Sequence, residues 1–309
     1  MRVAITGAGG LVGLQVAGQA VAAGHEVVGV VRSAESARRL RQAGARAALV
    51  PGLEADPLAA ALAGADAVVH LAQIGREAPG RTYAEVNVAG TRALVEAARR
   101  CGVGRVVYFS GLGVARYGMA RHCTNPYFLS KLACEAELLG CGIETVVFRP
   151  SYVLGPGSDI VSELLRALRA GVVPRAGDGS YRLQPIAVSD AAALVVAALE
   201  RPPGAQPFVF DLVGPEPLSF DALLDRLAGA AGWGPRGGRW RVQPVPLEEA
   251  LQAARESGFL GMRADDFDCL LSDETGDARP LEALLGRSLQ PLDDALREPP
   301  AASPGSQGS

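Results

Sequence analysis

The stretch RVAITGAGGLVGLQVAGQAVAA (residues 2–23) predicts a strand, a glycine turn and a helix in direct succession. Gly7 permits a tight turn, Gly10 lets a phosphate approach bare backbone, and Gly13 lets the helix pack closely on the strand. A second apolar run at Glu26–Val31 closes a βαβ unit. The free N–H groups and the dipole at the start of the helix favour phosphate. This stretch therefore predicts a dinucleotide-binding site.

The same stretch is open to another interpretation, because no residue between Val3 and Gly24 is charged. An uncharged run of this length is also typical of a signal peptide or a membrane span. Its many glycines, its strand-like opening and the near absence of basic residues before it argue against both. We therefore expect no membrane span.

The bulk composition is that of a soluble globular chain. Of the 309 residues, 49% are hydrophobic and 20% charged, and the net charge of −3 gives no support to nucleic-acid binding. The 5 cysteines show neither a CxxC pair nor metal-ligand spacing, and an odd number fits reduced thiols in the cytoplasm.

Apolar runs alternate with helical patterns through the first 150 residues. Continuous apolar strands of this kind are typical of a parallel sheet covered on both faces. After the βαβ unit, strands are expected at Ala47–Val50, Ala67–Leu71, Arg105–Ser110 and Glu144–Arg149, and helices at Ala34–Ala43, Asp56–Ala63, Thr82–Arg100 and Pro126–Gly140. The pattern predicts an α/β fold with a six-stranded, doubly wound parallel sheet.

The alternation loosens beyond Pro150, which divides the chain into three parts. Residues 1–150 are predicted to bind the cofactor, and residues 151–297 to form a smaller lobe with some elements returning to the sheet. Residues 298–309 have a disordered composition. In the lobe, helices are expected at Ser158–Ala170, Ser189–Leu199 and Ser219–Ala231, the last capped by Ser219, and a strand at Pro207–Leu212.

The corner after the second strand bears on cofactor choice. An acid there binds the ribose 2′-hydroxyl of NAD, whereas a basic residue accommodates the 2′-phosphate of NADP. The corner reads Val31, Arg32, Ser33, with no acid. We interpret Arg32 as a phosphate ligand rather than a surface arginine. NADP is therefore the expected cofactor, with NAD as the alternative.

The segment NPYFLSK (residues 125–131) holds Tyr127 and Lys131 in YxxxK spacing. On a helix, residues four apart share one face, so the phenol and the ammonium point the same way. A nearby cation favours the phenolate, which a proton-transferring tyrosine needs. Of 30 basic residues, Lys131 is the only lysine, which indicates that this position needs a compact ammonium rather than a guanidinium.

Several motifs together resemble the extended short-chain dehydrogenase/reductases. They are TGAGGLVG (6–13), HLA (70–72), NVAGT (87–91), YFSG (108–111), PYFLSK (126–131) and FRPSYVLGPG (148–157). The nucleotide-sugar epimerases of that family share the PYxxSK helix and the RPxxxxGPG loop. Residues 259–296 are more similar to an atypical branch that includes the nucleotide-binding accessory subunit of respiratory complex I.

The resemblance implies a Rossmann-type domain, a smaller carboxy-terminal lobe and a catalytic set of a hydroxyl residue, Tyr127 and Lys131. In that set Tyr127 exchanges a proton with substrate, and Lys131 holds the nicotinamide ribose. The residues expected around the cofactor are Gly7, Gly10, Leu11, Val12, Gly13, Arg32, Leu53, Leu71, Ala72, Lys131 and Pro150.

Two positions depart from the family pattern. The catalytic hydroxyl residue is expected two residues after Ser110, where the chain has Leu112. Ser110 or Thr124 is left to supply the hydroxyl. We include Ser110 in the predicted catalytic set. Leu53 stands where the family has an aspartate near the adenine, and we expect it to pack against the ring.

Five other polar residues near the expected site have open interpretations. His70 either lies beside the cofactor or packs at the end of its strand, and a buried Asn87 is expected to be structural. His122 and Cys123 either border the substrate or lie in an exposed loop. Arg149 either braces a loop or contacts substrate.

The sequence therefore predicts an NAD(P)-dependent oxidoreductase or epimerase acting on an unidentified small molecule. The alternative is a non-catalytic NADP(H)-binding protein that stabilises or senses a partner, which Leu112 favours. A homodimer or a subunit of a larger complex is compatible with either. Fold and cofactor site do not identify the substrate.

Overall fold

The computed structural model describes residues 1–117, 125–206, 208–234, 239–260, 262, 267 and 273–297. Its centre is a seven-stranded sheet in the order β11-β6-β5-β4-β1-β2-β3. The strands are β1 (Arg2–Thr6), β2 (Glu26–Val31), β3 (Arg46–Leu49), β4 (Ala67–His70), β5 (Arg105–Phe109), β6 (Glu144–Pro150) and β11 (Val209–Leu212). Strands β1 to β6 pair in parallel, which confirms the predicted fold class. The predicted number of six strands is wrong, because β11 joins the sheet beside β6.

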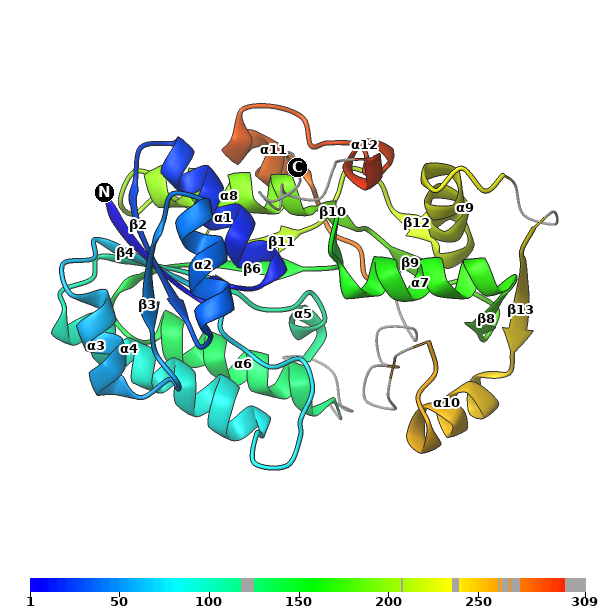
Figure 1. Ribbon diagram of the computed structural model, residues 1–309, viewed down its shortest axis with the longest axis horizontal. Helices are drawn as coiled ribbons and strands as arrows, with labels where there is room; N and C mark the ends of the chain where they lie inside the picture. The colour runs from blue at the N-terminus through cyan, green and yellow to red at the C-terminus, as the bar shows by residue number, and fades with distance from the viewer. Residues whose placement is uncertain are drawn as a thin grey trace, which may run out of the picture. The chain divides into compact units, whose positions relative to one another are not determined.

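Helices cover both faces of this sheet (Figure 1). One face carries α1 (Leu11–Ala22), α2 (Ala34–Gln42) and α8 (Val188–Glu200), and the other carries α3 (Ala55–Leu62), α4 (Gly90–Arg100) and α6 (Pro126–Leu139). The central strands β1, β2, β4 and β5 are almost entirely buried and consist largely of valine and alanine, whereas the edge strand β3 has no buried residue.

The structure differs at its start from the helix predicted over Thr82–Arg100. Ala84–Ala89 is a π-helical segment, η1, which runs directly into α4. Such π-helical turns are frequent at functional sites. The short helix α5 (Val114–Tyr117) follows β5 and was not predicted.

The start of α6 is fixed by its capping residues. The Asn125 side chain accepts hydrogen bonds from the backbone N–H of Tyr127 at 2.9 Å and of Phe128 at 3.4 Å, and Pro126 occupies the first turn. Proline is pre-organised for this position, and an asparagine cap satisfies otherwise free N–H groups. These residues set where Tyr127 lies on the helix.

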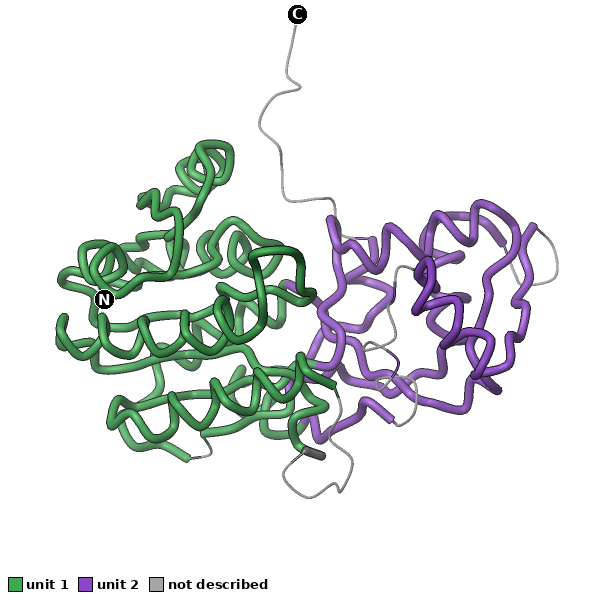
Figure 2. Tube along the Cα trace, turned by 90° about the horizontal axis from the view of Figure 1, so that it is seen from below, with its two compact units in different colours: residues 1–150, 189–211, 279–287 green, residues 151–188, 212–278, 288–309 purple. Residues whose placement is uncertain are grey.

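The chain divides into two compact units (Figure 2). Unit 1 comprises residues 1–150, 189–211 and 279–287 and includes α11 (Arg279–Leu285). Unit 2 comprises residues 151–188, 212–278 and 288–309. The predicted tail, residues 298–309, lies outside the described residues.

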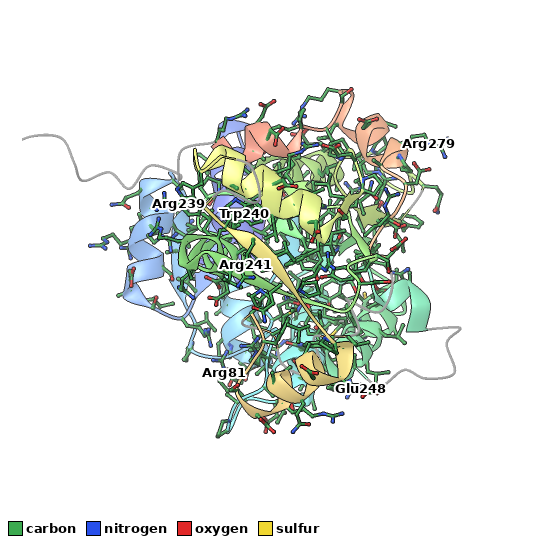
Figure 3. The ribbon with its side chains drawn as sticks, turned by 90° about the vertical axis from the view of Figure 1, so that its right-hand side faces the viewer. Arg81, Arg239, Trp240, Arg241, Glu248 and Arg279 are labelled. Carbon is green, nitrogen blue, oxygen red and sulfur yellow. The ribbon has the colours of Figure 1, made fainter. Side chains whose placement is uncertain are left out.

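Unit 2 has short strand pairs and a separate apolar core. Its elements are β7 (Val153–Leu154), α7 (Asp159–Ala170), β8 (Val172–Ala176), β9 (Arg182–Leu183), β10 (Ile186–Ala187), β12 (Leu218–Ser219), α9 (Phe220–Ala230), β13 (Arg241–Val245), α10 (Leu247–Glu256) and α12 (Leu292–Arg297). Trp240 is 1% exposed and anchors the core, while Arg239 and Arg241 on either side are exposed (Figure 3). The Ser219 side chain caps α9 by accepting from Ala222 N–H at 3.1 Å, as predicted.

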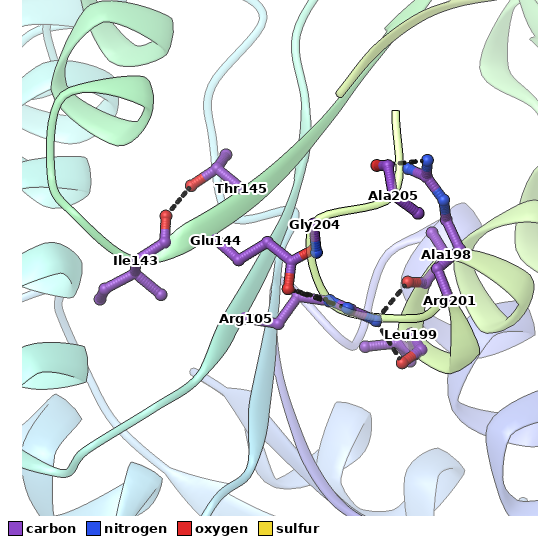
Figure 4. A network of polar contacts seen from close by, with 9 residues as sticks. All are labelled: Arg105, Ile143, Glu144, Thr145, Ala198, Leu199, Arg201, Gly204 and Ala205. Atoms are coloured by element: carbon purple, nitrogen blue, oxygen red, sulfur yellow. Dashed lines mark hydrogen bonds and ion pairs between the residues drawn. The ribbon is translucent and has the colours of Figure 1, made fainter. Parts of the chain in front are cut away.

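A buried arginine ties α8 to the sheet in unit 1 (Figure 4). Arg105 on β5 donates to the carbonyl oxygens of Ala198 at 3.0 Å and Leu199 at 2.7 Å, and to the Glu144 carboxylate on β6 at 2.9 Å. Glu144 also accepts from Gly204 N–H at 3.1 Å. The cation thus neutralises both a carboxylate and the carboxyl end of a helix.

Within the described part of the chain, every helix is too short or too polar to span a bilayer.

Candidate active site

The glycine turn after β1 has the backbone geometry of a phosphate site. Gly7 has φ of +68°, and a Cβ there would lie 2.7 Å from the backbone nitrogen of Ala72. A Cβ at Gly13 would lie 2.7 Å from the Cα of Ala8, so only glycine allows α1 to pack this closely. Gly10 is the N-cap of α1 without a side-chain cap, which leaves N–H groups for an anion.

A cavity of about 1120 Å³ opens over this turn in unit 1. Six of the predicted cofactor residues line it: Gly7, Gly10, Arg32, Leu53, Leu71 and Ala72. The lining does not include Leu11, Val12, Gly13, Lys131 or Pro150. The volume, the crowded Gly7 and the open helix end fit a dinucleotide.

One corner of the cavity is formed by Arg32, Ser33 and Ser36. Ser33 Oγ donates to Ser36 Oγ at 3.0 Å and accepts from Ser36 N–H at 3.2 Å, so it caps α2. Arg32 is exposed and forms no ion pair with any described residue. Its guanidinium is therefore available to a ligand anion.

Leu53 contributes an apolar wall to the cavity. Its side chain lies against the start of α4, where a Cβ at Gly90 would come within 2.6 Å of Leu53 Cδ1. Ala89 and Ala93 line the same wall. Small residues on this helix thus leave room beside Leu53 for a flat ring.

Tyr127 and Lys131 lie one turn apart on α6, and both contact Gln73. Gln73 Oε1 accepts from Lys131 Nζ and from Tyr127 OH, the latter at 3.5 Å. Lys131 is fully buried, and its Nζ also donates to the Phe109 carbonyl at 2.5 Å. Burial lowers the pKa of Lys131 to about 7. Gln73 itself lines the cavity, so the tyrosine–lysine pair adjoins it.

The position from which the catalytic hydroxyl was expected is apolar. Leu112 is 4% exposed, and its N–H donates to the Pro150 carbonyl at 2.8 Å, so it belongs to the core. Ser110 is 1% exposed, and its Oγ has no hydrogen-bond partner among the described residues. Thr124, His122 and Cys123 lie outside the described residues.

His70 belongs to a buried polar chain and does not line the cavity. Its Nδ1 lies 2.7 Å from Thr6 Oγ1 and its Nε2 3.1 Å from Thr91 Oγ1. Thr91 donates to the Asn87 carbonyl at 2.7 Å, and Asn87 Nδ2 donates to Ser130 Oγ at 3.1 Å. Burial, followed by the charge of Lys131, lowers the pKa of His70 to about 3. The neutral imidazole thus links β1, α4 and, through Asn87, α6, which supports its packing interpretation.

Arg149 braces α6 from the sheet. It donates to both carboxylate oxygens of Glu135, at 3.0 and 2.6 Å, and Glu135 is 2% exposed. Glu135 follows Lys131 by one helical turn, so this pair fixes the helix close to the candidate catalytic residues. Arg149 thus braces the helix α6 and not the loop that was expected.

Several residues that line the cavity were not predicted from the sequence, namely Gly9, Ser33, Ser36, Glu54, Gln73 and Arg81. Gln73 directly follows the HLA segment at the end of β4, where ligands of parallel sheets bind. Its position at the carboxyl end of a central strand is the feature that could have identified it.

Comparisons with known proteins identify the family of this chain. Residues 3–211 match the NAD dependent epimerase/dehydratase family. The chain is 30% identical over 255 residues to a 2-alkyl-3-oxoalkanoate reductase of Stenotrophomonas maltophilia, covering 75% of this chain and 76% of the relative. It is 28% identical to a mitochondrial NADH dehydrogenase (ubiquinone) 1 alpha subcomplex subunit 9 of Arabidopsis thaliana, covering 82% of this chain and 62% of that one.

Among solved structures, MoeE5 in complex with UDP-glucuronic acid and NAD is 25% identical, with a TM-score of 0.71 and 96% of each chain covered. The chain belongs to the NAD-dependent epimerase/dehydratase family, the extended short-chain dehydrogenase/reductases. This confirms the resemblance drawn from the sequence motifs.

Proposed function

We propose that this protein is an NADP(H)-dependent reductase or epimerase that uses Tyr127 and Lys131 for proton transfer. The observation that carries the proposal is that Tyr127 OH and Lys131 Nζ meet at one oxygen of Gln73, at the wall of the dinucleotide-sized cavity. When bound, the nicotinamide would supply or accept the hydride. The similarity to a reductase and to an NAD-binding sugar-nucleotide protein supports this class of chemistry.

We assign separate roles in cofactor binding and proton transfer to the residues of the site. Gly7, Gly10 and the start of α1 bind the pyrophosphate, and Lys131 holds the nicotinamide ribose. The ammonium also favours the phenolate of Tyr127, which exchanges a proton with a substrate hydroxyl or carbonyl. Ser110 remains the predicted hydroxyl residue, and its unpartnered Oγ supports that role. We assign cofactor binding to residues 1–150, substrate binding to residues 151–297, and a cytoplasmic location to the protein.

Substitution of Arg32 tests the proposed preference for NADPH over NADH. We expect Arg32→Ala to weaken NADPH binding about 10- to 150-fold and to leave NADH binding unchanged, because the lost contact is to the 2′-phosphate. Fluorescence titration of both nucleotides measures this. Arg38→Ala, an exposed arginine of α2 outside the cavity lining, is the matched control. Equal affinity of the unsubstituted protein for NADH and NADPH would exclude the NADP proposal.

The second candidate function is a non-catalytic NADP(H)-binding protein that stabilises or senses a partner. The buried Leu112 in place of a hydroxyl residue favours it, and so does the similarity to a mitochondrial dehydrogenase subunit. A subunit role or a homodimer is compatible with both candidates. If the protein is an enzyme, a group other than Leu112, such as Ser110, has to hold the substrate carbonyl.

Leu112→Ser separates the two candidates. If a missing hydroxyl limits turnover, this variant is expected to raise kcat/KM for an α-diketone about tenfold or more, since a donor at a developing oxyanion contributes at least that much. NADPH affinity is expected to stay the same. Leu112→Ala creates similar space without the hydroxyl and is the control. A gain in both variants would assign the effect to space rather than to the hydroxyl.

A further inference from the structure

Gln73 joins an exposed loop to a buried cation. The residue follows β4, is itself exposed and lines the cavity, whereas Lys131 has no exposed surface. Within the described part of the chain, Lys131 Nζ donates only to the Phe109 carbonyl and to Gln73 Oε1. An exposed side chain therefore supplies one of the two acceptors to which the single lysine of the protein donates.

The chemistry of these groups fixes which end of the amide faces the lysine. An ammonium has three donors and no acceptor, so Gln73 must present its oxygen, which accepts from Tyr127 OH as well. A buried ammonium without acceptors carries a large desolvation cost, so this oxygen is hard to lose without replacement. Any ligand that binds Lys131 and Tyr127 must therefore bring a neutral or anionic oxygen of its own.

A ribose hydroxyl is such an oxygen. In the proposed function, the nicotinamide ribose binds to Lys131 through the same donors that now bind Gln73. We propose that Gln73 competes with the ribose of a bound dinucleotide for Lys131 and Tyr127, and that cofactor binding exchanges one oxygen for the other. This inference rests on the proposed function of Lys131 as the ribose ligand.

The exchange makes Gln73 a residue that sets cofactor affinity. Binding must break the two hydrogen bonds to Oε1 before the ribose gains its own, so the dinucleotide binds more weakly than the cavity alone would allow. NADPH and NADH share the nicotinamide ribose and are affected equally. By contrast, substitution of Arg32 is expected to change the affinity for NADPH alone.

Two substitutions at position 73 are expected to act in opposite directions. Gln73→Leu removes the competing oxygen and is expected to tighten both NADPH and NADH about tenfold. Gln73→Glu offers Lys131 a charged oxygen and is expected to weaken both. Fluorescence titration measures the affinities, with Gln42→Leu at the exposed end of α2 as the control. Unchanged or weaker binding by Gln73→Leu would overturn the inference.

A second measurement needs no nucleotide. Because the chain has one lysine, protein labelled with 13Cε-lysine gives one lysine resonance, and its pH titration reports the pKa of Lys131. Gln73 Oε1 favours the ammonium, so we expect the midpoint to fall in Gln73→Leu from about 7 in the unsubstituted protein. The titratable groups that act on Lys131 stay the same in both proteins: His70, Tyr108, Tyr127, Cys134 and Glu135.

The two measurements separate this inference from the proposed function. If no variant binds either nucleotide, the proposed function fails and this inference fails with it. If the unsubstituted protein binds NADPH but Gln73→Leu changes neither affinity nor the lysine midpoint, only this inference fails. Tighter binding together with a lower midpoint supports it.

Discussion

Replacing Tyr127 by phenylalanine is expected to lower turnover about 100- to 10,000-fold, because the substitution removes the group that transfers the proton. NADPH affinity is expected to change little. The Tyr127 hydroxyl has a long contact of 3.5 Å to Gln73, and the ring keeps its packing at 5.8 Å from Tyr83 and 5.4 Å from Phe128. Kinetics with NADPH and an α-diketone measure turnover, fluorescence titration measures NADPH affinity, and complementation of a deletion strain tests the function in the cell.

Lys131→Arg is the companion to this variant. A planar guanidinium is bulkier than an ammonium and directs its donors differently, so it should fit poorly in a fully buried position between Phe109 and Tyr108. We expect it to damage both NADPH binding and turnover. If Tyr127→Phe complements the deletion strain as well as the original gene does, the protein is not a tyrosine-dependent enzyme and the non-catalytic candidate stands.

Local patterns explain why much of the fold could be predicted. The run EVVGVV, which forms β2, is apolar and buried after the exposed Glu26, and a short valine-rich run of this kind is typical of a strand buried on both faces. The glycine turn was predictable because Gly7 adopts a left-handed conformation that disfavours other residues. The capping residue Ser219 was recognisable for a similar reason, since its hydroxyl satisfies a free N–H group.

The features that could not be predicted depend on residues distant in sequence. Nothing near Gln73 indicates that it meets a helix 58 residues later, because that contact depends on how β4 and α6 pack. The place of β11 next to β6 likewise follows from tertiary packing rather than from its own four residues. The π-helical turn contains Asn87, whose side chain bonds Ile74 and Ser130 on other segments.

Arg105→Met is expected to lower the free energy of unfolding by about 3–5 kcal/mol, the usual cost of removing one partner of a buried ion pair. Arg105 is 8% exposed, and the Glu144 side chain has a relative exposure of 20%. The methionine fills a similar volume but leaves that carboxylate and the carbonyls of Ala198 and Leu199 without their donor. Urea denaturation followed by circular dichroism measures the loss.

Two further variants test whether this loss of stability comes from the polar contacts of Arg105. Arg100→Met breaks the ion pair between an arginine of α4 and the exposed Asp56. No measurable change in the free energy of unfolding is expected, because water screens that pair. In the Arg105→Met background, Glu144→Gln is expected to recover part of the stability, since a neutral amide without a partner costs less than a carboxylate. If Arg105→Met is no more destabilising than Arg100→Met, the attachment of α8 to the sheet depends on apolar packing and not on the buried cation.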